Sequence, residues 1–258
     1  MKNDTKTFII SLILFLMMFY LLRRRTETFT DDNYWKRHDP EFLKNADLSK
    51  FNMKIRDIGL KEENSFLAKL LLDSPVNSVF LDVGAYTGDT SLAVSEILNR
   101  EGRKDIEMIA FEPNMSHCKT INQTARKLGY NLICMNVVVS DKKGVMYSRG
   151  SEGSGTVYTD ETNGKSFPTD TLDNLLGGKD IFLLKIDVEG HEVEVLRGAK
   201  KTLQKTNHVY IEMWNDEHLK DRGYDKTSSH NKLILNELKN FYPIQKMEKN
   251  VFFTAKYA

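Results

Sequence analysis

Leu184-Lys185-Ile186-Asp187-Val188-Glu189-Gly190-His191-Glu192 is the most informative stretch, because it places ionisable side chains where the apolar run Ile181–Ile186 meets a helical pattern. Side chains alternate across a strand, so Asp187 and Glu189 are expected to share one face. Ligands of open α/β sheets bind beyond the carboxyl ends of the strands. Asp187, Glu189 and His191 are therefore candidates for acid–base or metal chemistry. The plainer alternative is that a carboxylate caps the following helix and His191 is a surface residue of its first turn.

Strand and helix patterns alternate along the chain, which predicts an α/β fold with a mostly parallel sheet flanked by helices. The expected strands are 78–84, 106–111, 132–139, 181–186 and 209–214, with 251–255 pairing at an edge. The expected helices are 62–73, 89–99, 115–128, 193–203 and 229–241. Residues 148–164 are rich in Gly, Ser and Thr, and they are expected to form a loop that acts as a lid.

The N-terminal segment differs in composition from the rest. Residues 8–22 carry no charge, and with Thr7 they would form a helix of roughly 24 Å, a marginal membrane span. Arg23–Arg25 follow directly, where a cleaved signal peptide would have small residues, so an uncleaved anchor is expected. This predicts an anchor over 1–25, a stalk over 26–47 and one domain over 48–258. The basic flank predicts a cytoplasmic domain.

Composition narrows the possible partners. A formal net charge of +1 provides no basic footprint for nucleic acid. The two cysteines, Cys118 and Cys134, are expected to be reduced core residues. The glycosylation sequons at Asn114 and Asn122 are expected to be unmodified on a cytoplasmic domain.

The first strand-to-helix turn is DVGAYTGD, residues 82–89. Gly84 can adopt backbone angles that a Cβ would penalise and allows a ligand to approach closely, while Gly88 opens the helix. Tyr86 stands where a dinucleotide fingerprint would have its second glycine, which argues against a pyrophosphate site. An ordinary tight turn would have the same sequence features.

Polar groups recur at the predicted strand ends. Glu112 ends the second strand, where a carboxylate can accept hydrogen bonds from both ribose hydroxyls. Ser140 and Asp141 end the third, at the level of an adenine ring. The acidic residues at five strand ends are Asp82, Glu112, Asp141, Asp187 and Glu212. Their alignment predicts a nucleoside-containing ligand.

Together these residues resemble the FkbM family of S-adenosylmethionine-dependent methyltransferases. The resemblance is carried by LDVGAYTGDT (81–90), FEP (111–113), NVVVSD (136–141), TLD (171–173) and LKIDVEGHE (184–192). It covers about residues 79–203 and implies a seven-stranded Rossmann-like methyltransferase fold. It also implies that the methionine side of S-adenosylmethionine is bound by Asp82 and Gly84, the ribose by Glu112 and the adenine by Asp141. The further cofactor-binding candidates are Ala85, Tyr86, Gly88 and Ser140.

The family commonly methylates hydroxyl oxygens, so the resemblance implies a glycan, a lipid-linked saccharide or a related metabolite as acceptor. Methyl transfer to an alcohol requires removal of its proton. His191 is a candidate base because a helix N-terminus disfavours the imidazolium ion. Asp187, Glu189 and Glu212 are the other candidates. A divalent ion on Asp187 and Glu212 would be a further route, but two carboxylates are weak evidence and no metal is expected.

Three other functions remain open at this point. A nicotinamide oxidoreductase could also use Glu112 for a ribose, although the glycine fingerprint is broken. A cap-type ribose methyltransferase would need a second lysine beside Lys185, Asp187 and Glu212, and no position is compelling. A non-catalytic, membrane-anchored scaffold is the third alternative, against which the intact acidic residues argue.

Overall fold

The computed structural model describes residues 62–149, 157–159, 165–214, 227–247 and 249–256. The chain divides into two compact units, 1–50 and 51–258, and all described residues belong to the second. The expected anchor and stalk lie outside them. Within the described ranges, no helix is both long enough and apolar enough to cross a bilayer.

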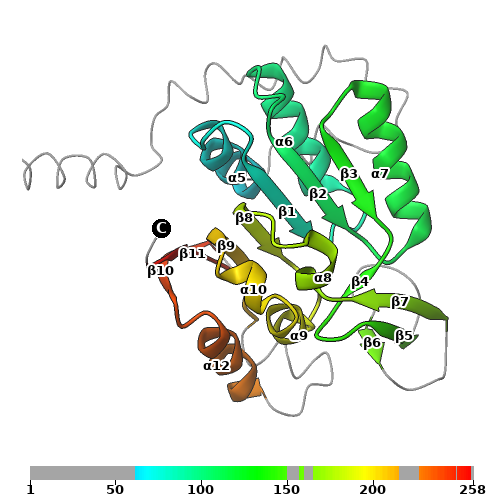
Figure 1. Ribbon diagram of the computed structural model, residues 1–258, viewed down its shortest axis with the longest axis vertical. Coiled ribbons are helices and arrows are strands. Elements are labelled where there is room, and N and C mark those ends of the chain that lie inside the picture. Colours follow the sequence, from blue (N-terminus) through cyan, green and yellow to red (C-terminus); the bar gives the residue numbers. More distant parts are fainter. Residues whose placement is uncertain (1–61, 150–156, 160–164, 215–226, 248, 257–258) are drawn as a thin grey trace, which may run out of the picture. The chain divides into compact units, whose positions relative to one another are not determined.

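A seven-stranded sheet forms the centre of the fold (Figure 1), in the order β10-β11-β9-β8-β1-β2-β3. Its strands are β1 (Val79–Val83), β2 (Glu107–Phe111), β3 (Leu132–Met135), β8 (Ile181–Ile186), β9 (Thr206–Glu212), β10 (Phe241–Met247) and β11 (Asn250–Ala255). The five strands from β3 to β9 are parallel, whereas β11 runs antiparallel to both β9 and β10. This confirms the predicted Rossmann-like α/β architecture.

Helices cover both faces of this sheet. They are α5 (Glu62–Leu72), α6 (Asp89–Arg100), α7 (Met115–Leu128), α8 (Leu172–Leu176), α9 (Glu192–Arg197), α10 (Lys200–Leu203) and α12 (Thr227–Glu237). Apolar side chains of α5, α6 and α7 pack with Phe80 on one face. Those of α8, α9 and α12 pack with Leu81 and Val83 on the other. The strand alternation therefore separates two cores, and the cavity described below lies at the carboxyl ends of the strands between them.

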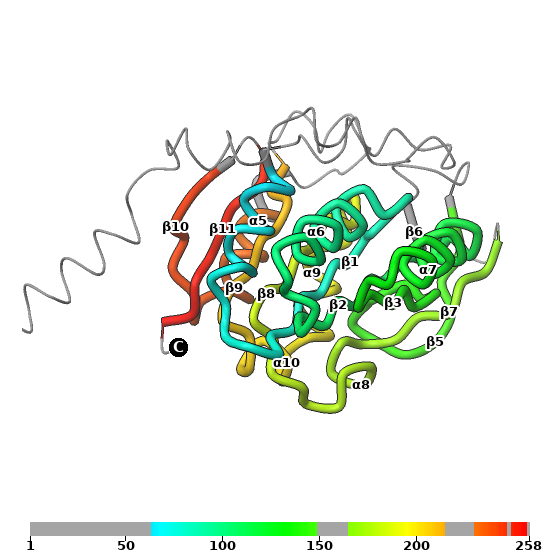
Figure 2. The backbone as a smooth tube through the Cα atoms, turned by 90° about the horizontal axis from the view of Figure 1, so that it is seen from above, coloured from blue at the N-terminus to red at the C-terminus, as the bar shows by residue number. Residues whose placement is uncertain are grey.

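A second, four-stranded sheet lies beside β3 (Figure 2), with strand order β4-β7-β5-β6. Its strands are β4 (Val138–Val139), β5 (Gly144–Arg149), β6 (Val157–Thr159) and β7 (Ser166–Asp170). The expectation of one strand over 132–139 was wrong, because the chain turns at Met135 and β4 pairs with β7 instead of β2. The expected loop over 148–164 contains β6, whose β-branched residues favour a strand. Its remaining residues 150–156 and 160–164 lie outside the described ranges.

The C-terminal part also departs from the prediction. α12 ends at Glu237, four residues before the expected end of this helix. Phe241, the last residue of the expected helix, instead begins β10. β10 is the edge strand, where Pro243 is tolerated, and β11 lies inside the sheet between β9 and β10. The expected helix over 193–203 is interrupted at Gly198, where a Cβ would lie 2.0 Å from the Ser140 carbonyl oxygen.

Cys118 and Cys134 form a disulfide between α7 and β3, with their Cα atoms 5.4 Å apart. The expectation of two reduced thiols was wrong. The helix that follows β2 returns along the sheet and packs on β3, so two residues 16 apart in sequence become neighbours. Sequence spacing alone does not reveal this pairing.

Candidate active site

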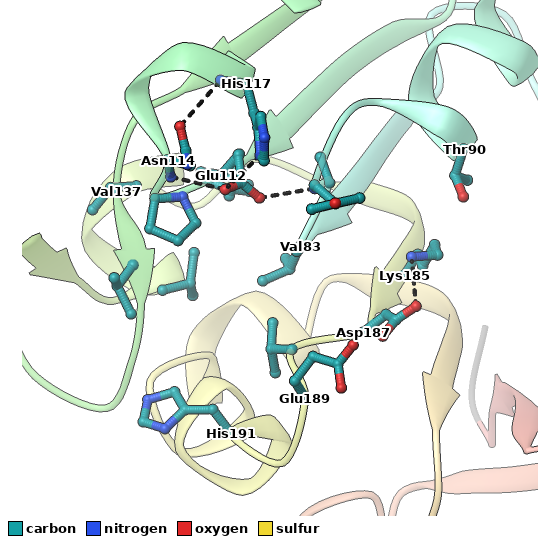
Figure 3. A pocket seen from close by; sticks show the side chains of 18 of the residues that line it. Val83, Thr90, Glu112, Asn114, His117, Val137, Lys185, Asp187, Glu189 and His191 are labelled. Carbon is teal, nitrogen blue, oxygen red and sulfur yellow. Dashed lines mark hydrogen bonds and ion pairs between the residues drawn. The ribbon is translucent and has the colours of Figure 1, made fainter. Parts of the chain in front are cut away.

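A cavity of about 260 Å³ lies at the carboxyl ends of β1, β2 and β8 (Figure 3). The predicted site residues that line it are Gly84, Ala85, Tyr86, Glu112, Asp187, Glu189 and His191. The predicted site residues that do not line it are Asp82, Gly88, Ser140, Asp141 and Glu212. The structure thus brings together most of the predicted residues and assigns the others to the surrounding framework.

The turn between β1 and α6 packs directly on the loop that follows β8. A Cβ on Gly84 would lie 1.9 Å from the Asp187 carbonyl oxygen, and Gly84 has a φ of +88°. The backbone N–H groups of Gly84 and Ala85 both donate to the Phe111 carbonyl, at 3.0 and 3.1 Å. Glycine at position 84 therefore allows three strand ends to converge on one cavity.

Asp82 and Gly88 hold this turn from outside the cavity. Asp82 is buried, accepts a 2.5 Å hydrogen bond from Ser91 Oγ and lies 3.3 Å from Lys185 Nζ. Gly88 precedes α6, and a Cβ there would lie 2.7 Å from Ile121. Asp82 thus links α6 to the sheet, whereas Gly88 lets the start of α6 approach α7.

Glu112 is the buried carboxylate of the cavity. Its two oxygens each accept one backbone N–H at 2.8 Å, from Tyr86 and from Asn114. Burial raises its pKa to about 7, although both N–H groups act in the opposite direction. Nδ1 of His117 lies 3.7 Å away, and the His117 ring meets the Tyr86 ring edge-on at 4.9 Å. Each carboxylate oxygen retains acceptor capacity for a hydroxyl donor, so a ribose diol fits here.

The wall beside Glu112 is apolar and is formed by Val137, Val138, Val139 and Phe167. Such a surface suits the faces of a purine ring. Asp141, expected at the adenine, is exposed, and Ser140 Oγ lies 2.9 Å from Nε2 of His191. The segment that carries both residues belongs to the second sheet, which explains why the strand-end alignment did not place them in the cavity.

His191 is separated from the carboxylates with which it was expected to act. Its Nε2 is engaged with Ser140, and its Nδ1 lies 3.6 Å from Glu194. Figure 3 shows its ring turned away from Asp187 and Glu189. Its assignment as the base stays a prediction, and the contacts favour a role in holding the loop against Ser140.

Asp187 and Glu189 both face the cavity from the loop after β8 (Figure 3). β8 ends at Ile186, and Glu189 has a φ of +56°, so a loop rather than strand alternation places the two carboxylates together. Burial opposes ionisation of Asp187, but the Lys185 ammonium 3.5 Å away and a hydrogen bond with Glu212 hold its pKa below the usual value.

Glu212 ends β9 and is buried behind Asp187. Burial and the Asp187 charge raise its pKa to about 8. It pairs with Lys249, whose carbonyl accepts the Met213 N–H at 2.7 Å. Lys249 lines the cavity and is the second lysine that the ribose methyltransferase alternative lacked. Sequence analysis missed Lys249 because only the antiparallel pairing of β11 with β9, which sets Asn250 opposite Glu212, brings it there.

A metal site is a separate question for this cluster of acids. Within the ranges that the structure describes, no group of three or more His, Cys, Asp or Glu side chains is arranged to hold a metal ion. His117 is a further cavity residue that sequence analysis overlooked, and its backbone N–H donates to Oδ1 of Asn114, the N-cap of α7.

The chain matches known proteins across this region. Residues 82–235, more than half of the chain, match the family described as "Methyltransferase FkbM domain". "Hexuronic acid methyltransferase AglP" of Haloferax volcanii is 27% identical over 165 residues, which cover 62% of this chain and 65% of that protein. The chain therefore spans about 65% of the length of this curated relative.

Solved structures are also similar at low identity. "Methyltransferase FkbM" from Methylobacillus flagellatus has 14% identity to this chain and a TM-score of 0.47. The match covers 70% of this chain and 44% of the Methylobacillus chain. A "SAM dependent methyltransferase" from Aquifex aeolicus has the same identity and TM-score. This match covers 84% of this chain and 98% of the Aquifex chain. The family match includes the cavity residues from Val83 to His191. The chain belongs to the FkbM methyltransferase family, as its sequence motifs predicted.

Proposed function

We propose that the protein is an S-adenosylmethionine-dependent methyltransferase that methylates an oxygen of a saccharide acceptor. The observation that carries the proposal is the cavity in a family methyltransferase domain, with a ribose-type carboxylate at one end and paired carboxylates at the other. A nicotinamide oxidoreductase would not account for the family match, and an inactive scaffold would not account for the intact acidic residues.

At the cofactor end, Glu112 would accept hydrogen bonds from the ribose hydroxyls. The backbone of the turn at Gly84 and Ala85 would lie against the methionine part. Val138 and Phe167 would cover the purine. The cofactor, when bound, supplies an electrophilic methyl group. The chain's own residues then have to exclude water, orient the acceptor oxygen and receive its proton.

At the acceptor end, we assign the proton acceptor to Glu189. Asp187 is a weak base because Lys185 and Glu212 hold its pKa below the usual value. Its ionised carboxylate is suited to orienting the acceptor by accepting a hydrogen bond. Glu189 faces the same space from the loop after β8.

A uronic acid within a glycan or lipid-linked saccharide is the acceptor class that we propose, because the Haloferax relative is named for hexuronic acid. The test is transfer of labelled methyl from S-adenosylmethionine to para-nitrophenyl β-D-glucuronide, with the matching glucoside as control. We expect label on the glucuronide above that on the glucoside. Release by mild alkali would identify a methyl ester, and alkali-stable label a methyl ether. Label on neither compound would reject this acceptor class.

A second candidate acceptor is RNA, because Lys185, Asp187, Glu212 and Lys249 now provide two lysines with two carboxylates. The net charge of +1 gives little attraction for a phosphate backbone. A capped RNA oligonucleotide therefore belongs in the same assay as a comparison. Label on that oligonucleotide and none on the glucuronide would reverse the assignment.

We further propose that Thr7–Leu22 anchors the protein in a membrane and that the domain is cytoplasmic. The uncharged run and the basic residues after it support this orientation. The Cys118–Cys134 disulfide is of a kind that persists mainly in oxidising compartments, so the orientation requires a direct measurement.

A further inference from the structure

Glu192 is a buried acid at the start of α9 that lies outside the cavity lining. It is 1% exposed. One carboxylate oxygen accepts the backbone N–H groups of Val188, at 3.3 Å, and Gly190, at 3.0 Å. The other oxygen lies 2.9 Å from Nε2 of His230 on α12. Two of these contacts are made to the backbone of the loop after β8, and the third is made to α12.

The loop that Glu192 binds has an unfavourable backbone. Glu189 has a φ of +56° and Gly190 one of +100°. A left-handed conformation costs a residue with a Cβ roughly 1–2 kcal/mol, so the local sequence does not hold this shape by itself. The Glu192 carboxylate binds the N–H groups on both sides of Glu189, which fixes the direction in which the Glu189 side chain leaves the loop.

α12 reaches a second loop of the site through the neighbouring residue. Nδ2 of Asn231 donates to the Trp214 carbonyl at 2.7 Å, just beyond the strand end that carries Glu212. His230 and Asn231 therefore link one helix to the loops after β8 and β9. The loop after β8 carries Asp187 and Glu189, and β9 ends at Glu212, two residues before Trp214.

We propose that Glu192 and His230 form a positioning pair that holds Glu189 and Asp187 toward the acceptor. The pair acts through the backbone of Val188 and Gly190 and touches neither cofactor nor acceptor. Its role in turnover rests on the proposed function, whereas its effect on the loop does not. Glu112 lies at the opposite end of the cavity, so we expect the pair to affect turnover more than cofactor affinity.

The test compares His230→Ala and Glu192→Gln with the conservative His230→Gln, whose amide can still donate to Glu192. Glu237→Gln is the matched control, because Glu237 pairs with Arg197 between the same two helices, away from the loop. Three quantities are measured on the full chain: amide exchange at Val188 and Gly190, affinity for S-adenosylmethionine, and turnover with para-nitrophenyl β-D-glucuronide.

For His230→Ala we expect exchange at Val188 and Gly190 to accelerate and turnover to fall by about tenfold or more, the scale of one lost charge-assisted hydrogen bond. Cofactor affinity should stay within about twofold, and His230→Gln should recover part of both losses. Glu237→Gln should change neither quantity. Unchanged exchange, or acceleration spread evenly over α9 and α12 with a lower unfolding midpoint, would overturn the proposal. If wild-type protein shows no turnover, the proposed acceptor is rejected. Amide exchange at Val188 and Gly190 would still test whether Glu192 and His230 hold the loop.

Discussion

At the scale of single residues, Glu112 combines burial with two backbone N–H bonds, and its pKa of about 7 makes its charge sensitive to ordinary pH. Only the ionised carboxylate can accept hydrogen bonds from two ribose hydroxyls without using one oxygen as a donor. Its function in cofactor binding can therefore be tested by pH as well as by mutation.

Cofactor affinity should fall as the pH is lowered through about 7, because Glu112 becomes protonated, and should level off above it. Calorimetric titrations of S-adenosylmethionine on either side of this value measure the effect. Glu112→Gln should bind more weakly and lose this pH dependence. An equal dependence in wild type and Glu112→Gln would assign the titration to another group.

Two residues compete for the role of base, and their contacts differ. Glu189→Gln should reduce turnover by about 10²- to 10⁴-fold, the usual cost of losing a general base, with cofactor affinity preserved. His191→Ala should have a smaller effect, because the His191 ring is engaged with Ser140. Steady-state rates with the true acceptor measure both. If both variants keep near-wild-type rates, the base lies elsewhere, and Glu212 is the next candidate.

At the scale of elements, the contact between the β1–α6 turn and the loop after β8 depends on Gly84. Gly84→Ala combines an unfavourable φ with a Cβ 1.9 Å from the Asp187 carbonyl. Gly102→Ala is the matched control, since its φ is +78° and nothing lies within 4 Å of its added Cβ. The pair of variants separates backbone strain from steric overlap.

Gly102→Ala should lower the free energy of unfolding by roughly 1–2 kcal/mol, the cost of the left-handed backbone. Gly84→Ala should lose about 1–3 kcal/mol more, as overpacking does, and should also weaken cofactor binding. Urea denaturation and calorimetry on both variants provide the values. Equal losses of stability would show that the contact between the two loops tolerates a side chain.

The elements best predicted from sequence were those with continuous apolar runs, such as β1 and β8, since a buried parallel strand needs no partner to be recognised. β6, β7 and β10 were missed, and β4 was merged with β3, because their pairing depends on segments elsewhere in the chain. The same limit applies to the site. Glu112 and Asp187 could be placed from strand ends, whereas Lys249 reaches Glu212 only through the pairing of β11 with β9.

At the scale of the whole molecule, the disulfide and the expected anchor concern where the protein works. Cys118 and Cys134 are 16 residues apart, and closing a loop of this size stabilises a fold by about 3 kcal/mol in the chain-entropy account. Replacing both cysteines by alanine should lower the free energy of unfolding by that order. Wild-type protein treated with reductant should show the same decrease in the free energy of unfolding as the double alanine variant. A wild-type protein that is insensitive to reductant and has two titratable thiols would contradict the disulfide.

Carbonate extraction should leave the full chain with membranes if Thr7–Leu22 is an anchor. Glycosylation at Asn122 is a poor reporter of orientation, because its amide bonds both the N–H and the carbonyl of Cys134, each at 2.8 Å. A sequon appended after Ala258 is the better probe. We expect no glycan on it for a cytoplasmic domain, and a glycan there would reverse the orientation.

The central claim is that Glu112 and the acidic loop after β8 serve opposite ends of one cavity. Calorimetry of S-adenosylmethionine binding to wild type, Glu112→Ala and Glu189→Gln tests it most directly. We predict binding by wild type, a loss of roughly ten- to a hundredfold in affinity for Glu112→Ala, and unchanged affinity for Glu189→Gln. No binding by wild type, or equal affinity for wild type and Glu112→Ala, would contradict the account.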